Sequence, residues 1–252
     1  MSGKTDNLTY EKKILIRSEQ VDMTRKLRMS ELFRLMEEAS IAHTEELGCT
    51  REKTLDRGLL WVITHQQAEI EEMPAYDEEI TVRSWQGDIM HVFFPRFYEI
   101  ERAGKVLVRG KALWMLIDEE SRQMIMPEEY GISIPGRPGS EDMMLAPVVI
   151  PASLRESCLI YDRELVTRFS QVDINGHMNN TRYFDMIDDA HYELSHAPGK
   201  IVPRLVRAYY LSELRAGDRF DLKGFRDEEG KEFFEGADGD KVKFRISMEY
   251  RE

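Results

Sequence analysis

QVDINGHMNNTRYFDMIDDA (residues 171–190) has a counterpart earlier in the chain, QVDMTRKLRMSELFRLMEEA (residues 20–39), at a constant offset of 151 residues. Five of the twenty aligned positions are identical, and several others keep an apolar or acidic character. In both stretches apolar residues recur at helical spacing, so each predicts a helix with one buried face, preceded by Ser30 or Thr181 as its N-cap. A repeat of this kind indicates two copies of one structural unit.

Each predicted helix lies within a longer pattern of strands. An apolar run precedes each helix, and four strand-like runs follow it: residues 58–70, 78–85, 91–101 and 105–118 in the first half, and 203–214, 218–225, 231–236 and 241–250 in the second. Turn-like segments with Gly, Asp and Pro separate the runs. The order predicts an α+β fold in which an antiparallel sheet wraps a long helix, twice in one chain.

The repeat also predicts the domain organisation. A stretch rich in Pro and Gly, residues 135–155, is typical of a connection between two units. We therefore expect an N-terminal domain over residues 1–134, a linker over 135–155 and a C-terminal domain over 156–252.

Composition and motifs exclude several classes of protein. A formal net charge of −12 argues against a nucleic-acid binder, because such binding needs clustered Lys and Arg. No apolar run approaches the roughly 20 residues of a membrane span, and the first residues lack the apolar core of a secretory signal, so we expect a cytoplasmic protein without a membrane span. Cys49 and Cys158 form neither a disulfide framework nor a metal motif. We predict no metal and no cofactor.

The polar loop ahead of the second helix is the candidate site. Asp173, Asn175 and His177 combine an acceptor, a donor and a titratable ring, although Asp and Asn before a helix commonly serve only as turn and cap residues. The first copy starts its helix with Thr24 and Lys26 where the second has Asn175 and His177. The latter two are therefore not needed to start a helix, whereas the Asp shared by both copies fits a structural role.

The segment DINGHMNNTRYFD, together with LLWV at residues 59–62, resembles the acyl-acyl carrier protein thioesterases of plants and bacteria. The resemblance implies a tandem, or double, hot-dog fold and hydrolysis of fatty acyl-acyl carrier protein to a free fatty acid. It also implies a fourth site residue, Glu213, in YYLSELRAGD. Plant-type members usually carry Cys directly after this Glu, but here the residue is Leu214, which excludes a thiolate nucleophile at that position.

Direct attack by water on a thioester needs a base, donors for the carbonyl oxygen and groups that hold both in register. Glu213 is the candidate base. His177 lies ahead of a helix N-terminus, which disfavours imidazolium, so it is a neutral donor or the alternative base. Asn175 is expected to donate to the oxyanion, and Asp173 to fix the loop.

A second group of residues is assigned to the substrate. Asn179, Asn180 and Trp61 are expected to contact it, with the first half shaping the acyl pocket. Because an acidic carrier would be repelled by the net charge, Arg204 and Arg207 are the expected docking residues for acyl carrier protein. Two other readings stay open: a coenzyme A thioesterase or dehydratase-like enzyme of the same fold, and a non-catalytic acyl-binding module. The sequence also leaves a homodimer open.

Overall fold

The computed structural model describes residues 8–140, 145–195 and 202–251. Within these residues, one antiparallel sheet runs in the order β1-β3-β4-β5-β2-β7-β10-β9-β8-β6. The first half supplies β1 (Tyr10–Leu15), β2 (Leu59–Ile70), β3 (Glu79–Gln86), β4 (Phe93–Arg102) and β5 (Lys105–Asp118). The second supplies β6 (Leu159–Val166), β7 (Leu205–Tyr210), β8 (Arg219–Arg226), β9 (Glu232–Asp238) and β10 (Lys241–Glu249). The expected order of one strand, one helix and four strands in each half is confirmed.

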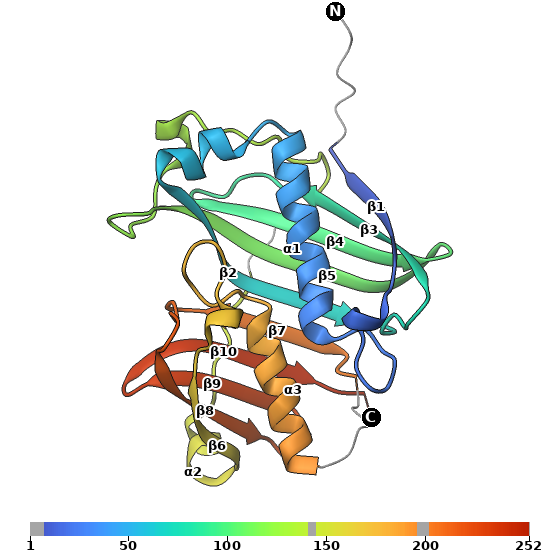
Figure 1. Cartoon of the computed structure of the whole chain (residues 1–252), viewed down its shortest axis with the longest axis vertical. Coiled ribbons are helices and arrows are strands. Elements are labelled where there is room, and N and C mark those ends of the chain that lie inside the picture. The colour runs from blue at the N-terminus through green and yellow to red at the C-terminus, as the bar shows by residue number, and fades with distance from the viewer. Residues whose placement is uncertain (1–7, 141–144, 196–201, 252) are drawn as a thin grey trace, which may run out of the picture.

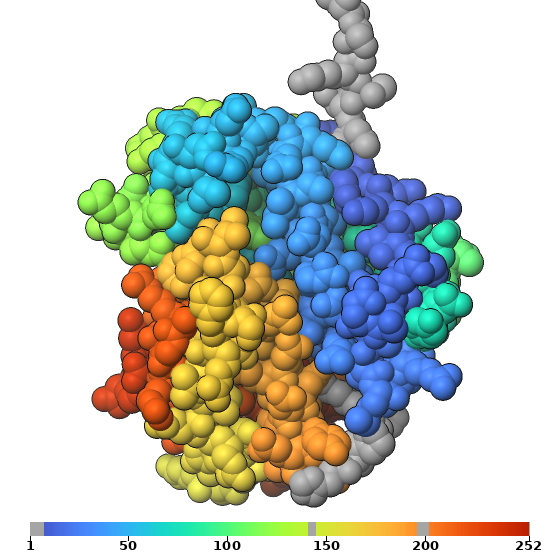
Figure 2. All heavy atoms as spheres, viewed as in Figure 1, coloured from blue at the N-terminus to red at the C-terminus, as the bar shows by residue number. Residues whose placement is uncertain are grey.

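Two long helices, α1 (Met29–Glu46) and α3 (Arg182–Ser195), lie side by side on the same face of this sheet (Figure 1). The buried face of α1 includes Leu32, Phe33, Met36, Ala39 and His43, at the spacing of an amphipathic helix. A side chain at Gly110 of β5 would collide with Met36, so glycine there lets the helix approach the sheet. The space-filling view shows the surfaces of α1 and α3 in contact (Figure 2).

Shorter helical segments complete the described chain. The helix α2 (Ala152–Ser157) precedes β6, and single 3₁₀ turns occur at η1 (Ser18–Gln20), η2 (Arg51–Lys53), η3 (Leu55–Arg57), η4 (Pro127–Tyr130) and η5 (Phe169–Gln171). No helix in the described ranges has the length and apolarity needed to cross a bilayer. The domain boundaries predicted from the sequence stay a prediction.

The two helix starts differ from each other. Thr181 stands directly before α3, as predicted, but the prediction of Ser30 as a cap is wrong. Arg28 occupies the N-cap of α1 without a capping side-chain hydrogen bond, and Ser30 is buried inside the first turn. The Arg28 N–H donates to the Gln20 carbonyl. The helix therefore begins at Met29, two residues before the start that an N-cap at Ser30 would give.

The halves meet along a pseudo-two-fold axis. Strand β2 pairs with β7, with Gln67 opposite Arg207 at the centre of the register and Arg207 Nε donating to Gln67 Oε1 at 3.1 Å. Between the helices, Phe33 and Phe184 stack with centroids 4.1 Å apart. These two rings are themselves partners in the sequence repeat, as expected where a two-fold axis passes through an interface. The chain therefore joins two copies as a symmetric dimer would join them.

Candidate active site

The loop from Asp173 to Met178 is held by its own backbone and by one carboxylate. The Asp173 N–H donates to the His177 carbonyl at 2.9 Å, and the Gly176 N–H to the Asp173 carbonyl at 3.1 Å. The Asn175 N–H donates to Asp173 Oδ1 at 2.8 Å. Gly176 has a φ of 77°, a conformation that suits glycine. Asp173 thus fixes the turn that presents Asn175 and His177.

The first-half loop from Asp22 to Leu27 repeats this geometry. The Asp22 N–H donates to the Lys26 carbonyl at 2.9 Å, the Arg25 N–H donates to the Asp22 carbonyl at 3.0 Å, and the Thr24 N–H donates to Asp22 Oδ1 at 2.8 Å. Arg25, at the position of Gly176, also has a positive φ of 64°. The turn therefore forms without Asn or His, which supports the inference that Asn175 and His177 do not serve the turn.

The second-half loop brings His177 against Glu213. His177 Nε2 lies 2.9 Å from Glu213 Oε2, and the Met178 N–H donates to the Leu214 carbonyl at 2.7 Å, which fixes the two segments in register. Arg122, in the turn after β5, forms an ion pair with the other Glu213 oxygen. Arg215 approaches the carboxylate at 3.9 Å. Glu213, the predicted base, is therefore surrounded by two guanidinium groups and one imidazole.

His177 is neutral in this setting. Burial, followed by the nearby positive charges of Arg122 and Arg215, lowers the pKa of His177 to about 4. The pKa therefore moves in the expected direction, with desolvation as the largest cause and the two arginines next. With Nε2 closer to Glu213 than to Arg122 Nη2, which is 3.5 Å away, the consistent tautomer carries its hydrogen on Nε2 and donates it to Glu213.

Two cavities meet at this loop. One, of about 250 Å³ and mostly apolar, lies in the first half between α1 and the sheet. The other, of about 410 Å³, contains His177, Glu213 and Arg122. Their common wall is formed by Leu60, Trp61, Asp173, Asn175 and Asn180. In the described part of the chain, the Asn175 side-chain amide has no hydrogen-bond partner, so it is free to bind a group placed where the cavities join.

Asn179 connects the loop to the first half instead of lining a cavity. Its Nδ2 donates to Glu37 Oε1 of α1 at 3.2 Å, while its Oδ1 accepts from the backbone and hydroxyl of Thr181. Burial raises the pKa of Glu37 to about 7, with a further increase from the nearby charge of Asp173. Glu37 Oε2 is buried and has no partner among the described residues. The first half, which was not expected to supply reacting groups, therefore places a titratable carboxyl group beside the loop.

The two predicted docking arginines lie apart from the cavities. Arg204 and Arg207 form ion pairs with Glu249, each at 3.0 Å. Arg207 lies on β7, and Glu213 follows the end of that strand. Neither arginine lines either of the two cavities.

Three residues near the site were not found from the sequence. Arg122 and Glu37 belong to the first half and reach the loop only through the pairing of β5 with β2 and of β2 with β7, and through the contact of α1 with α3. Tyr210 Oη lies 2.9 Å from Gln66 Oε1 and 3.1 Å from the Asn180 carbonyl, at the same junction. No local pattern marks them, because each contact joins segments far apart in the sequence.

The cysteines are not placed as nucleophiles. Cys49 is buried in the wall of the first cavity, and burial raises the pKa of its thiol. Cys158 is outside both cavities. A thiolate attack is therefore not supported by the geometry.

The chain thus forms two helix-on-sheet units, with a His–Glu pair in the second of two cavities that share a wall. The family models for the acyl-ACP thioesterase N-terminal domain and C-terminal domain match residues 7–131 and 160–235. The chain belongs to the acyl-ACP thioesterase family.

Individual relatives agree with this assignment. An acyl-[acyl-carrier-protein] hydrolase of Cuphea viscosissima is 24% identical over 71% of this chain and 46% of its own length. A dodecanoyl-[acyl-carrier-protein] hydrolase of Cinnamomum camphora is 26% identical over 71% of this chain and 50% of its own length. The chain spans about half the length of the curated relatives that it matches.

Solved structures support the fold. The 12:0-ACP thioesterase from Umbellularia californica superposes with a TM-score of 0.81 at 18% identity, over 99% of both chains. An acyl-ACP thioesterase from Bacteroides thetaiotaomicron superposes with a TM-score of 0.74 at 20% identity, over 99% of this chain and 100% of its own. The predicted double hot-dog fold is confirmed.

Proposed function

We propose that this protein hydrolyses the thioester of a fatty acyl-acyl carrier protein and releases a free fatty acid. The observation that carries the proposal is the His177–Glu213 pair, 2.9 Å apart, in a cavity that shares a wall with a mostly apolar one. Membership of the acyl-ACP thioesterase family supports the same reaction.

The two cavities suggest how the substrate lies. The acyl chain occupies the first-half cavity, where Trp61, Phe94 and Trp114 provide apolar surface. The thioester carbonyl then lies at the common wall, beside Asn175 and Asn180. The thiol arm of the carrier enters through the second cavity, past His177 and Glu213.

The reaction is a direct attack by water. Glu213 accepts a proton as the water oxygen bonds to the thioester carbonyl carbon, and the electron pair of the carbonyl moves onto its oxygen. Asn175 Nδ2 donates to this oxyanion. The carbonyl then reforms, the carbon–sulfur bond breaks, and the leaving thiolate takes the proton from Glu213.

His177 and Arg122 support the carboxylate. The neutral imidazole donates Nε2–H to Glu213 and so fixes its orientation, while Arg122 holds the second oxygen and keeps the imidazole uncharged. His177 as the base, with Glu213 orienting it, is the competing assignment, and the variant Glu213→Gln discussed below distinguishes the two.

Carrier docking through Arg204 and Arg207 is a further part of the proposal. Their common partner Glu249 offsets part of their charge, so a carrier carboxylate has to compete with it. Reversing both charges is expected to raise KM for the carrier-bound substrate at low salt and to leave a short coenzyme A thioester unaffected. A cytoplasmic location and a homodimer stay predictions from the sequence.

A panel of acyl thioesters on acyl carrier protein and on coenzyme A tests the function. Release of free thiol and fatty acid, faster from the carrier protein, is the expected result. Faster turnover of the coenzyme A substrates would reassign the carrier. Tight binding of every acyl chain without thiol release would reduce the protein to an acyl-binding module.

A further inference from the structure

The first cavity contains a buried guanidinium group that has no carboxylate partner in the part of the chain that the structure describes. Arg96, on β4, is 2% exposed. Its Nη1 bonds His43 Nδ1 at 2.7 Å, and its Nη2 donates to Thr44 Oγ1 at 2.6 Å and to the Ser40 carbonyl at 3.4 Å. Burial lowers the pKa of Arg96 to about 10, so the side chain still carries its charge at neutral pH. A buried charge without an opposite partner is unusual.

A second donor lies beside this guanidinium. Gln86 is directly opposite Arg96 in the register of β3 with β4, and it is also 2% exposed. Its Nε2 is buried and has no hydrogen-bond partner among the described residues. Both side chains line the first cavity. Buried amide donors are almost always hydrogen-bonded, so the unpaired Gln86 amide beside the Arg96 guanidinium indicates that an acceptor binds between them.

The second half shows what fills the equivalent position there. Strands β3 and β8 start in matching registers, with Leu15 opposite Glu79 and Val166 opposite Arg219. Seven residues further along these strands, Gln86 in the first half is equivalent to Arg226 in the second. Their partners on the next strands, Arg96 and Glu232, are therefore equivalent as well.

The second-half pair is closed by its own carboxylate. Glu232 is 3% exposed, and its oxygens lie 2.7 Å from Arg226 Nη2, 2.6 Å from His191 Nε2 and 2.6 Å from Tyr250 Oη. Although burial alone raises it, these bonds, with the charge of His191, hold the pKa of Glu232 at about 2. The first half has two donors at these positions, Gln86 and Arg96, but the first cavity lies where the second half has the Glu232 carboxylate.

The donor pair is separated from the reacting groups along α1. Glu37, which contacts the site loop through Asn179, and Thr44, which contacts Arg96, are seven residues apart, or about 10 Å along a helix. Both line the first cavity, which therefore extends from the site loop to the guanidinium.

We propose that this cavity selects acyl chains whose far end carries a hydrogen-bond-accepting oxygen, which Arg96 and Gln86 bind. The substrate class is an ω-hydroxy, ω-oxo or ω-carboxy acyl thioester, and a terminal carboxylate would occupy the place that Glu232 fills in the second half. This specificity rests on the proposed thioesterase function, because it concerns the far end of the same acyl chain.

The test compares chain ends at constant chain length. Thioesters from hexanoyl to dodecanoyl, each with a methyl, an ω-hydroxyl or an ω-carboxyl end, are assayed on one carrier. At the length that reaches Arg96, kcat/KM is expected to be about tenfold to a hundredfold higher for an oxygen-bearing end, as for hydrogen bonds to charged groups. Equal or higher values for the methyl-ended chain at every length would overturn the proposal.

Two variants separate recognition from folding. Gln86→Leu removes a donor, Nε2, that has no partner among the described residues, and it is expected to reduce the preference severalfold while Arg96 keeps the remainder. The matched control is Arg226→Gln, which changes the equivalent residue of the second half and is expected to keep it. Arg96→Met is informative only with a thermal unfolding curve, since Arg96 also ties β4 to α1. A Gln86→Leu protein that keeps the full preference contradicts the assignment.

A binding measurement keeps this proposal separate from the function. The affinities of free ω-hydroxy, ω-carboxy and unsubstituted fatty acids are measured by calorimetry on the intact protein. Tighter binding of the oxygen-bearing acids supports the pocket even if no thioester is cleaved, which would overturn only the proposed function. Hydrolysis of all thioesters together with equal affinities would overturn only the specificity.

Discussion

The loops 22–27 and 173–178 have the same backbone conformation but different side chains at equivalent positions. Each is closed by an Asp carboxylate and by the same backbone hydrogen bonds, and each has one residue with positive φ. The first carries Lys26 and the second carries His177 at the same position. The difference teaches that the turn is a scaffold, and that the side chains mounted on it decide whether it has a reactive group.

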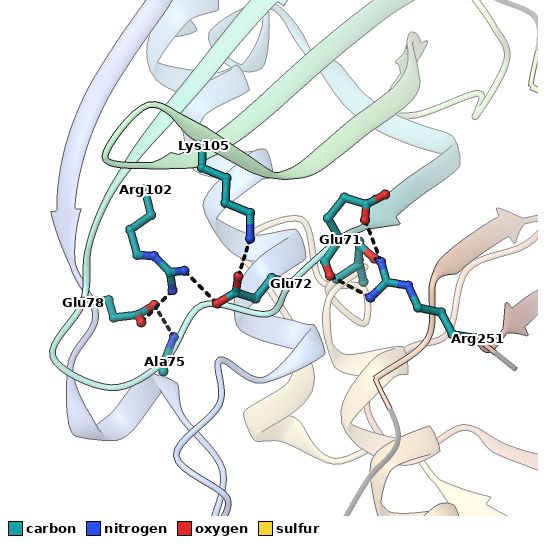
Figure 3. Close-up of polar contacts among 8 residues, drawn as sticks. Glu71, Glu72, Ala75, Glu78, Arg102, Lys105 and Arg251 are labelled. Atoms are coloured by element: carbon teal, nitrogen blue, oxygen red, sulfur yellow. Dashed lines mark hydrogen bonds and ion pairs between the residues drawn. The ribbon is translucent and has the colours of Figure 1, made fainter.

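The facing segments differ in the same way. Leu27 N–H donates to the Pro74 carbonyl, as Met178 N–H does to Leu214, so Met73 stands where Glu213 does. Around Met73 the first half uses its acidic groups in ion pairs: Arg102 binds Glu72 and Glu78, each at 2.7 Å, and Lys105 also binds Glu72 (Figure 3). Glu72 and Glu78, which neighbour Met73, are thus held in ion pairs away from both cavities, whereas Glu213 lines the second cavity.

The largest expected effect comes from Glu213→Gln. Because Gln keeps the size of the side chain but not the basic carboxylate, kcat is expected to fall by about 10²- to 10⁴-fold. The amide also places a donor where one carboxylate oxygen accepts from His177 or Arg122, so the melting temperature is measured on the same variant to separate lost stability from lost catalysis. Met73→Leu, at the equivalent position of the first half, is the control and should retain full turnover. Appreciable activity in Glu213→Gln, with a pH profile that follows an imidazole, would make His177 the base.

His177→Ala against Lys26→Ala sharpens the comparison of the loops. The first is expected to lower kcat by roughly tenfold to a thousandfold, and the second to leave it unchanged. The pKa of His177 is about 4 and the neutral ring is the active form, so the wild-type rate should be constant above that pH and fall as the pH drops through it. Equal loss in both variants would mean that the loops act only as structure.

Glu37→Gln tests the contribution of the first half through stability. The pKa of Glu37 rises from 4.5 to about 7 on folding, so the folded protein loses stability as pH rises between these values. The variant removes this loss and should be more stable than the wild type by about 3 kcal/mol above pH 7. The difference should vanish below pH 4.5, as measured by chemical unfolding across pH. A pH-independent difference would contradict the assignment.

The smallest effect is expected for the shared Asp. Asp22→Ala and Asp173→Ala each remove the turn's side-chain acceptor, and each should lower the free energy of unfolding by about 1 kcal/mol. Urea unfolding of the two variants measures this. A much larger loss for Asp173→Ala would mean that this carboxylate does more for the fold than its counterpart.

The sequence predicted most of the helices and strands because apolar periodicity is set by residues close together in the chain. It misjudged the end of β7, which was expected to reach residue 214. The strand stops at Tyr210, since the N–H groups of Leu211 and Ser212 both donate to the Lys243 carbonyl and interrupt the ladder. That departure from regular pairing precedes Glu213, and only the partner strand reveals it.

The site was partly predictable for a related reason. Asn175 and His177 could be found because the first copy of the repeat has other residues, Thr24 and Lys26, at the same positions. Glu213 could be found because of the resemblance to the acyl-acyl carrier protein thioesterases. Arg122, Glu37 and Arg96 could not be found, because their roles depend on which strands and helices become neighbours. The electrostatic surroundings of a site are set by tertiary contacts, so the charge state of His177 had a predictable direction and an unpredictable cause.

The stacked pair Phe33 and Phe184 has a consequence for binding stoichiometry. A dimer of identical subunits around such an axis would offer two equal sites and the opportunity for cooperativity between them. Here the axis relates one reactive loop to one that carries Lys26 and faces Met73. Saturation with a non-hydrolysable acyl thioester should therefore end at one molecule per chain, along a hyperbolic curve.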